Sequence, residues 1–150
     1  MADAMTAQQI ADAVGTQMFA KDRASQAMGM RIVAISEGAA FLEMTVRDDM
    51  LNGFDICHGG FITTLADSAF AFACNSHNRR TVAAGAEVRF RAPTRLGDVL
   101  TATAVERSRN GRDGVYDVTV TREDLVVAEF TGRSREIGGT FFDDAPEGER

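Results

Sequence analysis

The chain has 150 residues, of which 45% are hydrophobic and 25% charged, a composition typical of one globular domain with a sizeable core. Its formal net charge of −6 argues against a general nucleic-acid-binding protein. The N-terminus lacks the basic and apolar regions of a signal peptide, and Cys57 and Cys74 have no paired-motif spacing, so we expect a cytoplasmic protein with reduced thiols.

The first predicted elements are helical. Thr6 to Gln9 fit a capping box, and Ile10, Val14 and Met18 follow at one-turn spacing. A second helical turn over residues 24–28 ends before Gly29.

Alternation of apolar and polar residues then predicts strands. It covers residues 32–36, 42–47, 86–91, 100–104, 116–120 and 126–130, with turn residues between the runs. We therefore predict an α+β fold with an antiparallel sheet of about six strands. The domain should span residues 1–142, and residues 143–150 should form a flexible acidic tail.

An apolar segment with one charge separates the second and third strands. From Ile56 to Cys74, a run of 19 residues, Asp67 is the only Asp, Glu, Lys or Arg. We expect a helix that is buried on all sides, too short for a membrane span, with the sheet curled around it. Burying a carboxylate costs several kcal/mol unless it is paired. Three interpretations of Asp67 follow: it has a catalytic role, it is bonded to backbone or hydroxyl groups, or it reaches a solvent gap.

Basic residues concentrate in the second half of the chain. Between Arg79 and Arg135 there are 11 basic and 8 acidic residues, and all of the basic ones are arginine. Arginine's planar fork suits phosphate groups, so a phosphorylated small ligand is one interpretation. Solvated arginines on the outer faces of strands are the other.

Several motifs resemble those of one family. They are Met50-Leu51-Asn52-Gly53, Cys57-His58-Gly59-Gly60, Leu65-Ala66-Asp67-Ser68-Ala69-Phe70-Ala71, Ala73-Cys74-Asn75-Ser76, Gly114-Val115-Tyr116-Asp117 and Arg133-Ser134-Arg135-Glu136-Ile137-Gly138-Gly139-Thr140. Together they are similar to the hotdog-fold thioesterases, above all to the PaaI type of phenylacetic acid degradation. The resemblance implies a hotdog fold, paired protomers and hydrolysis of an acyl-CoA thioester. Its functional positions fall on Asn52, Gly53, His58, Gly59, Gly60 and Asp67.

Thioester hydrolysis needs a base or nucleophile beside the carbonyl carbon and donors aimed at the carbonyl oxygen. Asp67 is the candidate for general base on water or for direct nucleophile. The backbone N–H groups of Gly59 and Gly60 at the helix start are candidate donors, unless the pair only forms a tight loop. Ser68 is a candidate for holding the water. For Thr63 and Thr64 we expect hydroxyls bonded to carbonyls one turn back.

Neighbouring loop residues allow more than one role. Asn52 fixes the active-site loop or the thioester, or forms a plain Asn-Gly turn. His58 orients the loop or donates to substrate, or is structural. A thiol mechanism at Cys57 is disfavoured, because no orienting third group is visible. The two histidines, His58 and His77, have no metal-ligand spacing, and we expect no metal and no cofactor.

Spacing along the helix predicts a shared site. Asp67 follows Gly59 and Gly60 by seven to eight residues, roughly 10–12 Å along one helix axis. One carbonyl group cannot easily contact both ends of that interval. The groups can meet if two such helices run antiparallel across a dimer axis, so we expect a homodimer with shared sites that assembles into a homotetramer.

The resemblance implies (hydroxy)phenylacetyl-CoA or a similar aryl-acyl-CoA as substrate. Candidates for binding the CoA part are Asn75, Arg112, Arg133 and Arg135. Four apolar residues either line the acyl pocket or belong to the core: Phe54, Met50, Phe61 and Phe70. Two alternatives remain: a hotdog enoyl-CoA hydratase or dehydratase, which requires a positioned Asp–His pair, and a non-catalytic acyl-CoA-binding regulatory module. We expect neither nucleic acid nor membrane as a partner.

Overall fold

A computed structural model describes residues 3–144, so the predicted tail at 143–150 lies almost wholly outside the described residues. The helices are α1 (Ala7–Lys21), α2 (Arg23–Ala27), the 3₁₀ turn η1 (Asp48–Met50) and α3 (Gly59–Asn75). The strands are β1 (Arg31–Ser36), β2 (Ala39–Thr45), β3 (Thr81–Phe90), β4 (Val99–Asn110), β5 (Asp113–Arg122) and β6 (Leu125–Glu136). The capping box at Thr6 is present: its side chain accepts from the backbone of Gln9, whose side chain bonds back to Thr6.

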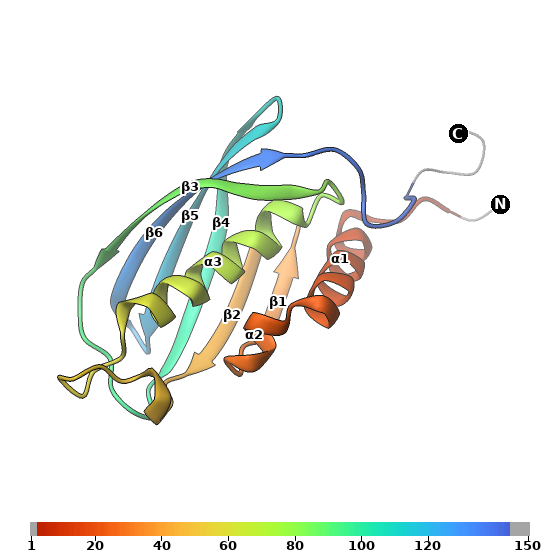
Figure 1. Ribbon diagram of the computed structural model, residues 1–150. Helices are drawn as coiled ribbons and strands as arrows, with labels where there is room; N and C mark the ends of the chain where they lie inside the picture. Colours follow the sequence, from red (N-terminus) through yellow and green to blue (C-terminus); the bar gives the residue numbers. More distant parts are fainter. Residues whose placement is uncertain (1–2, 145–150) are drawn as a thin grey trace.

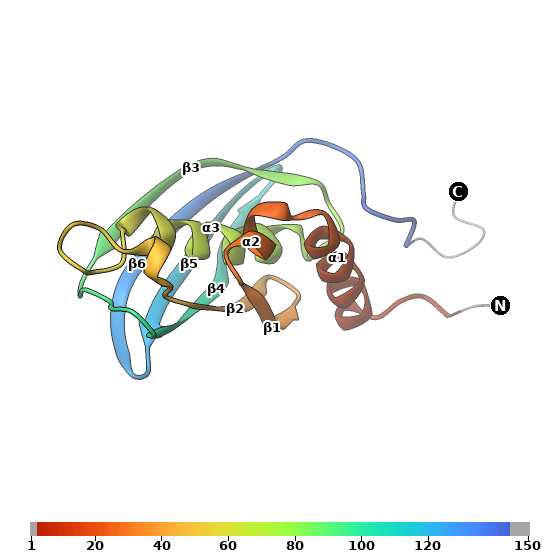
Figure 2. The same cartoon turned by 60° about the horizontal axis from the view of Figure 1, so that its bottom comes forward.

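The strands form one six-stranded sheet in the order β1-β2-β4-β5-β6-β3, and every neighbouring pair is antiparallel. The sheet curls around α3, and α1 and α2 lie beside the β1 edge (Figure 1, Figure 2). The predicted fold class is confirmed. Among residues 3–144, no helix is both long and apolar enough to cross a membrane.

Small residues let the sheet approach the helix. Ala40, Ala102 and Ala104 on the strands are fully buried. Gly132 of β6 lies under the ring of Phe70, and a Cβ at residue 132 would come within 2.8 Å of that ring. Since cores are close-packed, this contact leaves no space for a side chain at residue 132.

The expectation that α3 is buried on all sides is wrong for the single protomer. One stripe of the helix, at one-turn spacing, is exposed or only half-buried; it consists of Gly60, Thr64, Asp67 and Ala71. The sheet covers the opposite side of α3, as the core residues Leu65, Phe70 and Phe72 show. The sheet has too few strands to close around the helix, so α3 keeps one open face.

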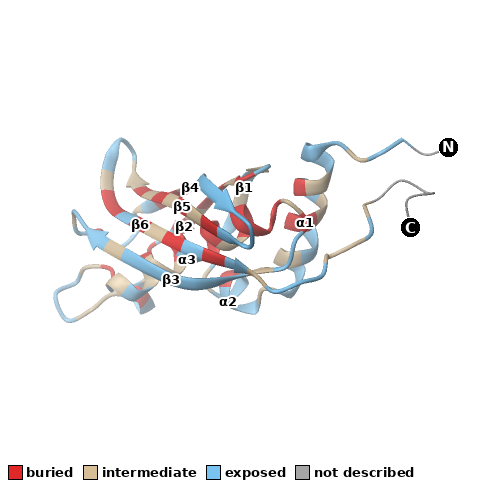
Figure 3. Cartoon of the chain, turned by 90° about the horizontal axis from the view of Figure 1, so that it is seen from above, coloured by how far each residue is buried: buried red, intermediate tan, exposed pale blue. Residues whose placement is uncertain are grey.

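β3 is the edge strand of the sheet at the opposite end from β1. It pairs only with β6, and eight of its ten residues are exposed, visible as the long pale-blue strand in Figure 3. Its sequence has no proline or lysine, two residues with which monomers often protect such edges, and its charged residues are Glu87 and Arg89.

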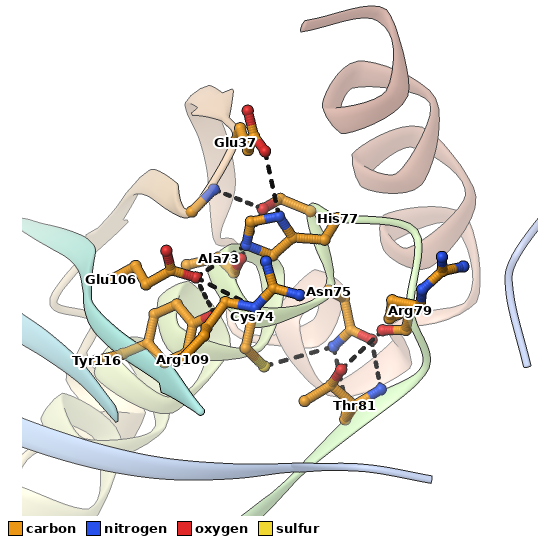
Figure 4. A network of polar contacts seen from close by, with 12 residues as sticks. Glu37, Ala73, Cys74, Asn75, His77, Arg79, Thr81, Glu106, Arg109 and Tyr116 are labelled. Carbon is orange, nitrogen blue, oxygen red and sulfur yellow. Dashed lines mark hydrogen bonds and ion pairs between the residues drawn. The ribbon is translucent and has the colours of Figure 1, made fainter. Parts of the chain in front are cut away.

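A polar network fixes the C-terminal end of α3 against the sheet (Figure 4). His77 Nε2 lies 2.9 Å from Glu106 Oε1 on β4, and the Tyr116 hydroxyl on β5 donates to the same oxygen at 2.9 Å. Glu37, in the β1–β2 turn, and Arg109 pair with this cluster at 3.6 Å. The network joins β4, β5 and the β1–β2 turn to His77, just after the end of α3, which holds the helix end against the sheet.

Candidate active site

The N-terminus of α3 is capped by its own preceding residue. His58 is the N-cap, and its Nδ1 accepts the Gly60 N–H at 3.3 Å. The expectation that both glycine amides are free is therefore wrong for Gly60, because a nearby side-chain acceptor occupies its amide. The Gly59 N–H has no acceptor within the described residues and remains the free donor. An accepting Nδ1 places the proton of a neutral His58 ring on Nε2.

A cavity of about 430 Å³ lies beside this helix start. It is lined by Asn52, Ile56, Cys57, Gly59, Ile62, Phe90, Arg91, Ala92 and Pro93. Two of the sequence-predicted site residues, Asn52 and Gly59, thus come together in one apolar hollow, while Asp67 is not part of its lining.

The loop before α3 is organised by Asn52. Its Oδ1 accepts the backbone N–H of Phe54 at 2.9 Å and that of Ile56 at 3.4 Å. This bonding fits both the loop-fixing role and the plain Asn-Gly turn, and its Nδ2 has no partner among residues 3–144. Phe54 lies at the loop tip with 83% of its surface exposed.

Asp67 lies on the open face of α3 and makes no hydrogen bond or ion pair with any residue between 3 and 144. Of the alternatives raised from sequence, a hydrogen bond from the Asp67 carboxyl to backbone or hydroxyl groups is therefore excluded. Contact of this carboxyl with solvent is observed in the single protomer. The pKa of its carboxyl is raised above the ordinary value, first by desolvation and second by the negative charge of Asp22. Asp67 is thus an unpaired carboxylate with increased basicity.

The hydroxyls around Asp67 divide into two groups. Thr63 donates to Gly59 O and Thr64 to Gly60 O, both at 2.8 Å, which confirms the predicted helix bonding. Ser68 instead contacts Ser25 of α2, with 2.8 Å between the two Oγ atoms. Ser68 is therefore bonded across to another helix rather than along its own.

The residues predicted to bind CoA lie apart from Asp67. Asn75 is buried, and its amide bonds to Ala71 and to both backbone groups of Thr81, joining the end of α3 to β3 (Figure 4). Arg133 and Arg135 alternate with Gly132 and Ser134, which face the helix side, so their side chains project from the outer sheet face. Arg135 pairs with Asp113 at 2.9 Å. A CoA-binding role for Asn75, Arg112, Arg133 and Arg135 stays a prediction.

Cys57 is a poor nucleophile in this setting. Its side chain is buried, and burial raises the pKa of its thiol. Within residues 3–144, no three His, Cys, Asp or Glu side chains cluster as metal ligands do.

Sequence reasoning missed Asp22, Ser25 and Phe90. Asp22 caps α2 through Ser25, and an Asp followed three residues later by Ser before a helical turn was a readable cap signal. The contact between Ser25 and Ser68 spans 43 residues of sequence, so no local pattern could have revealed it.

Comparison with known proteins places this geometry in a family. Residues 54–129 match the thioesterase superfamily. The acyl-coenzyme A thioesterase PaaI of Escherichia coli K12 is 43% identical over 129 residues, 85% of this chain and 92% of the relative.

Solved structures agree with this comparison. The E. coli PaaI protein from the phenylacetic acid degradation operon superimposes with a TM-score of 0.88 at 40% identity, covering 90% of this chain and 99% of that one. A mutant of phenylacetic acid degradation protein PaaI from Thermus thermophilus gives 0.75 at 34%, covering 77% and 100%. A Streptococcus mutans protein bound to acetyl CoA gives 0.71 at 26%, covering 74% and 90%. The chain therefore belongs to the thioesterase superfamily, with the hotdog fold of its PaaI-type members, and is a thioester hydrolase.

Proposed function

We propose that the protein hydrolyses aryl-acyl-CoA thioesters, with phenylacetyl-CoA and its ring-hydroxylated forms as substrates, to the free acid and CoA in cytoplasmic phenylacetate catabolism. The observation that carries the proposal is the unpaired Asp67 carboxylate on the open face of α3, on the same helix as the free Gly59 amide. The names of the E. coli and T. thermophilus relatives support an acyl-CoA substrate from phenylacetic acid degradation, and the acetyl CoA bound to the S. mutans protein supports an acyl-CoA ligand in general.

A second copy of the chain completes the site in this proposal. The open stripe of α3 and the free edge of β3 are both left uncovered in one protomer, and a two-fold partner can cover both at once. If Asp67 of each chain meets Gly59 of the other, symmetry places the axis midway between these residues, next to Thr63. Thr63 and Thr64 are half-buried here and small enough for two helices to approach closely. Two such dimers form the proposed homotetramer.

The reaction follows from the two groups. The Gly59 N–H, at the positive end of the α3 dipole, donates to the thioester carbonyl oxygen and stabilises the negative charge that develops there. Asp67 of the partner either takes a proton from the attacking water or attacks the carbonyl carbon directly. If water is the nucleophile, its oxygen bonds to the carbonyl carbon, the carbon–sulfur bond breaks, and the CoA thiolate takes up the proton held by Asp67. If Asp67 is the nucleophile, the carbon–sulfur bond breaks to leave a mixed anhydride on Asp67 and the CoA thiolate; water then hydrolyses the anhydride to the free acid, and the released proton goes to the thiolate. His58 and Asn52 offer the further donors Nε2–H and Nδ2–H at the same helix start.

The cavity beside Gly59 is the proposed acyl site. Its walls include Ile56, Ile62 and the ring of Phe90, which suit an aromatic acyl group. Phe54 at the exposed loop tip is positioned to contact a ligand or the second copy.

The test is release of free thiol from a panel of acyl-CoA thioesters by the wild type and by Asp67→Asn. We expect the highest kcat/KM with phenylacetyl-CoA and hydroxyphenylacetyl-CoA, and a loss of roughly 10²–10⁴-fold in the variant. Equal rates in both proteins would discard the mechanism. Tight binding without turnover would favour a regulatory module, and hydration of an enoyl-CoA would favour the hydratase alternative.

A further inference from the structure

A hydrogen-bonded chain links helix α2 to the residue beside Asp67. Asp22, the N-cap of α2, accepts the Ser25 N–H on Oδ1 at 3.0 Å, and its Oδ2 lies 2.6 Å from Ser25 Oγ. Ser25 Oγ lies in turn 2.8 Å from Ser68 Oγ. Only 1% of Ser25 and 8% of Ser68 is exposed. A carboxylate of the N-terminal segment is therefore connected through two buried hydroxyls to the turn of α3 that carries Asp67.

The carboxylate fixes the direction of the protons in this chain. An ionised carboxylate only accepts, so Ser25 donates its O–H to Asp22 and accepts the O–H of Ser68. Ser68 then presents only lone pairs to the rest of the site. Thr63 and Thr64 behave differently, since their hydroxyls donate to carbonyls of their own helix.

Asp22 also acts on Asp67 through space. Its negative charge is the second cause of the raised pKa of Asp67, after desolvation. Among residues 3–144, Cys74 of α3 also interacts with Asp67; it is a buried thiol whose pKa is raised to about 12. Lys21 and Arg80 share with Asp22 the lining of a separate cavity of about 290 Å³.

We propose that Asp22 is a positioning residue for thioester hydrolysis, which holds Ser68 as a hydrogen-bond acceptor beside Asp67 and keeps a second negative charge near the base. This inference rests on the proposed function. A water at Asp67 gives one hydrogen to the carboxylate and directs the other toward Ser68 Oγ. Its remaining lone pair then points at the carbonyl carbon.

Two variants separate the chain from the charge. Asp22→Asn keeps an acceptor for the Ser25 N–H but removes the charge, and its amide N–H₂ reverses the direction of the chain. Ser25→Ala cuts the chain and keeps the charge. Asp12→Asn is the control, because Asp12 is on α1, is exposed, and has a carboxylate whose one hydrogen-bond partner within residues 3–144 is Gln8. Asp22→Ser, which keeps a good N-cap, repeats the test if Asp22→Asn melts early.

The first readout is independent of turnover. Carbon-13 NMR follows the titration of the Asp67 carboxyl, assigned by its loss in Asp67→Asn. We expect a lower titration midpoint in Asp22→Asn than in the wild type and in Asp12→Asn, because a like charge has been removed. Superimposed titration curves for Asp22→Asn and Asp12→Asn would overturn the inference.

The second readout is thiol release from phenylacetyl-CoA. We expect kcat to fall about three- to tenfold in Asp22→Asn and Ser25→Ala, the worth of one hydrogen bond, with KM nearly unchanged. Only Asp22→Asn should move the acid limb of the pH profile to lower pH. Unchanged kcat in both variants would refute the positioning role. If the Asp67 midpoint is lower in Asp22→Asn than in the wild type but the wild type releases no thiol, the proposed function is refuted. The interaction between Asp22 and Asp67 would still stand.

Discussion

The ring of Phe90 lies directly over Gly59, so that a Cβ at residue 59 would come within 2.8 Å of the ring. Phe90 ends the edge strand β3 and is 54% exposed, and Gly59 begins α3. The proposed carbonyl donor and the free edge of the sheet are therefore in contact. A glycine is required at residue 59 because the ring occupies the place of a side chain.

Gly59→Ala should lower kcat. The new methyl group displaces either the Phe90 ring or the helix start, and a misplacement of about 1 Å in a catalytic group can cost about 10²-fold. Steady-state thiol release measures the effect, and the melting temperature should change little because the ring is on the surface.

The double variant Gly59→Ala, Phe90→Leu is the matched control for that contact. A smaller side chain at residue 90 leaves space for the methyl group, so kcat should recover at least in part relative to Gly59→Ala. Additive losses in the double variant would mean that the contact is not the cause.

Asp67→Asn should stabilise the protein at neutral pH while removing activity. The folded pKa of Asp67 is raised, so its contribution to stability is complete below the unfolded value and is lost as pH rises through the folded pKa. A neutral amide avoids that loss. Thermal melting should show a higher Tm for the variant at pH 7 and no difference below the ordinary Asp pKa.

Asp98→Asn gives the control of opposite sign. The backbone N–H of Arg95 and the guanidinium of Arg122 lower the pKa of Asp98. Its ionised form stabilises the fold above the ordinary Asp pKa, and this stability is lost as pH falls through the lowered value. The variant should therefore melt earlier at pH 7. If the Tm at pH 7 changes in the same direction in Asp67→Asn and Asp98→Asn, the opposite pKa shifts of the two carboxyls are contradicted.

Thr63→Glu should separate the protomers. Residue 63 lies next to the proposed two-fold axis, where two glutamates would face each other across the interface. Light scattering should detect a smaller assembly, and thiol release should be lost with it.

Thr16→Glu on α1 is a close match as a control, since Thr16 also donates to a carbonyl one turn back, at 3.0 Å, but is exposed. This variant should keep the assembly and the activity of the wild type. If Thr63→Glu behaves in the same way, the axis does not pass near residue 63.

Gly132→Ala should destabilise the core by about 1–3 kcal/mol, because the buried ring of Phe70 cannot move away from a methyl group 2.8 Å distant. Urea unfolding measures the change. Gly53→Ala is the reference, since its Cβ would meet nothing within 4 Å. An equal stability for the two variants would argue against the close contact between β6 and α3.

Much of the fold could be predicted because its signals are local. The capping box at Thr6, the alternation in β2, β4, β5 and β6 and the Gly59-Gly60 helix start each follow from a few consecutive residues. The open face of α3 could not be predicted in this way. The composition of the helix indicates that it is apolar all round, but the number of strands that cover it depends on long-range packing.

The candidate site shows the same division. Asn52, Gly59 and Asp67 were identified from sequence and remain the candidates, whereas the occupation of the Gly60 amide by His58 depends on one side-chain rotamer. The link from Asp22 through Ser25 to Ser68 arises from the packing of α2 against α3. Such contacts between distant segments leave no periodic signal in the sequence.

Mixed dimers test the central claim most directly. Asp67→Asn and Gly59→Pro chains are each expected to be inactive, because proline at the first helical position removes the N–H without breaking the helix. The Gly59→Pro chain also carries Phe90→Leu, since a Cβ at residue 59 would otherwise meet the Phe90 ring. In an equal mixture half of the dimers are mixed, and one site in each retains both native groups. The shared-site account predicts recovery of about a quarter of wild-type thiol release. A mixture no more active than its two parents would contradict it.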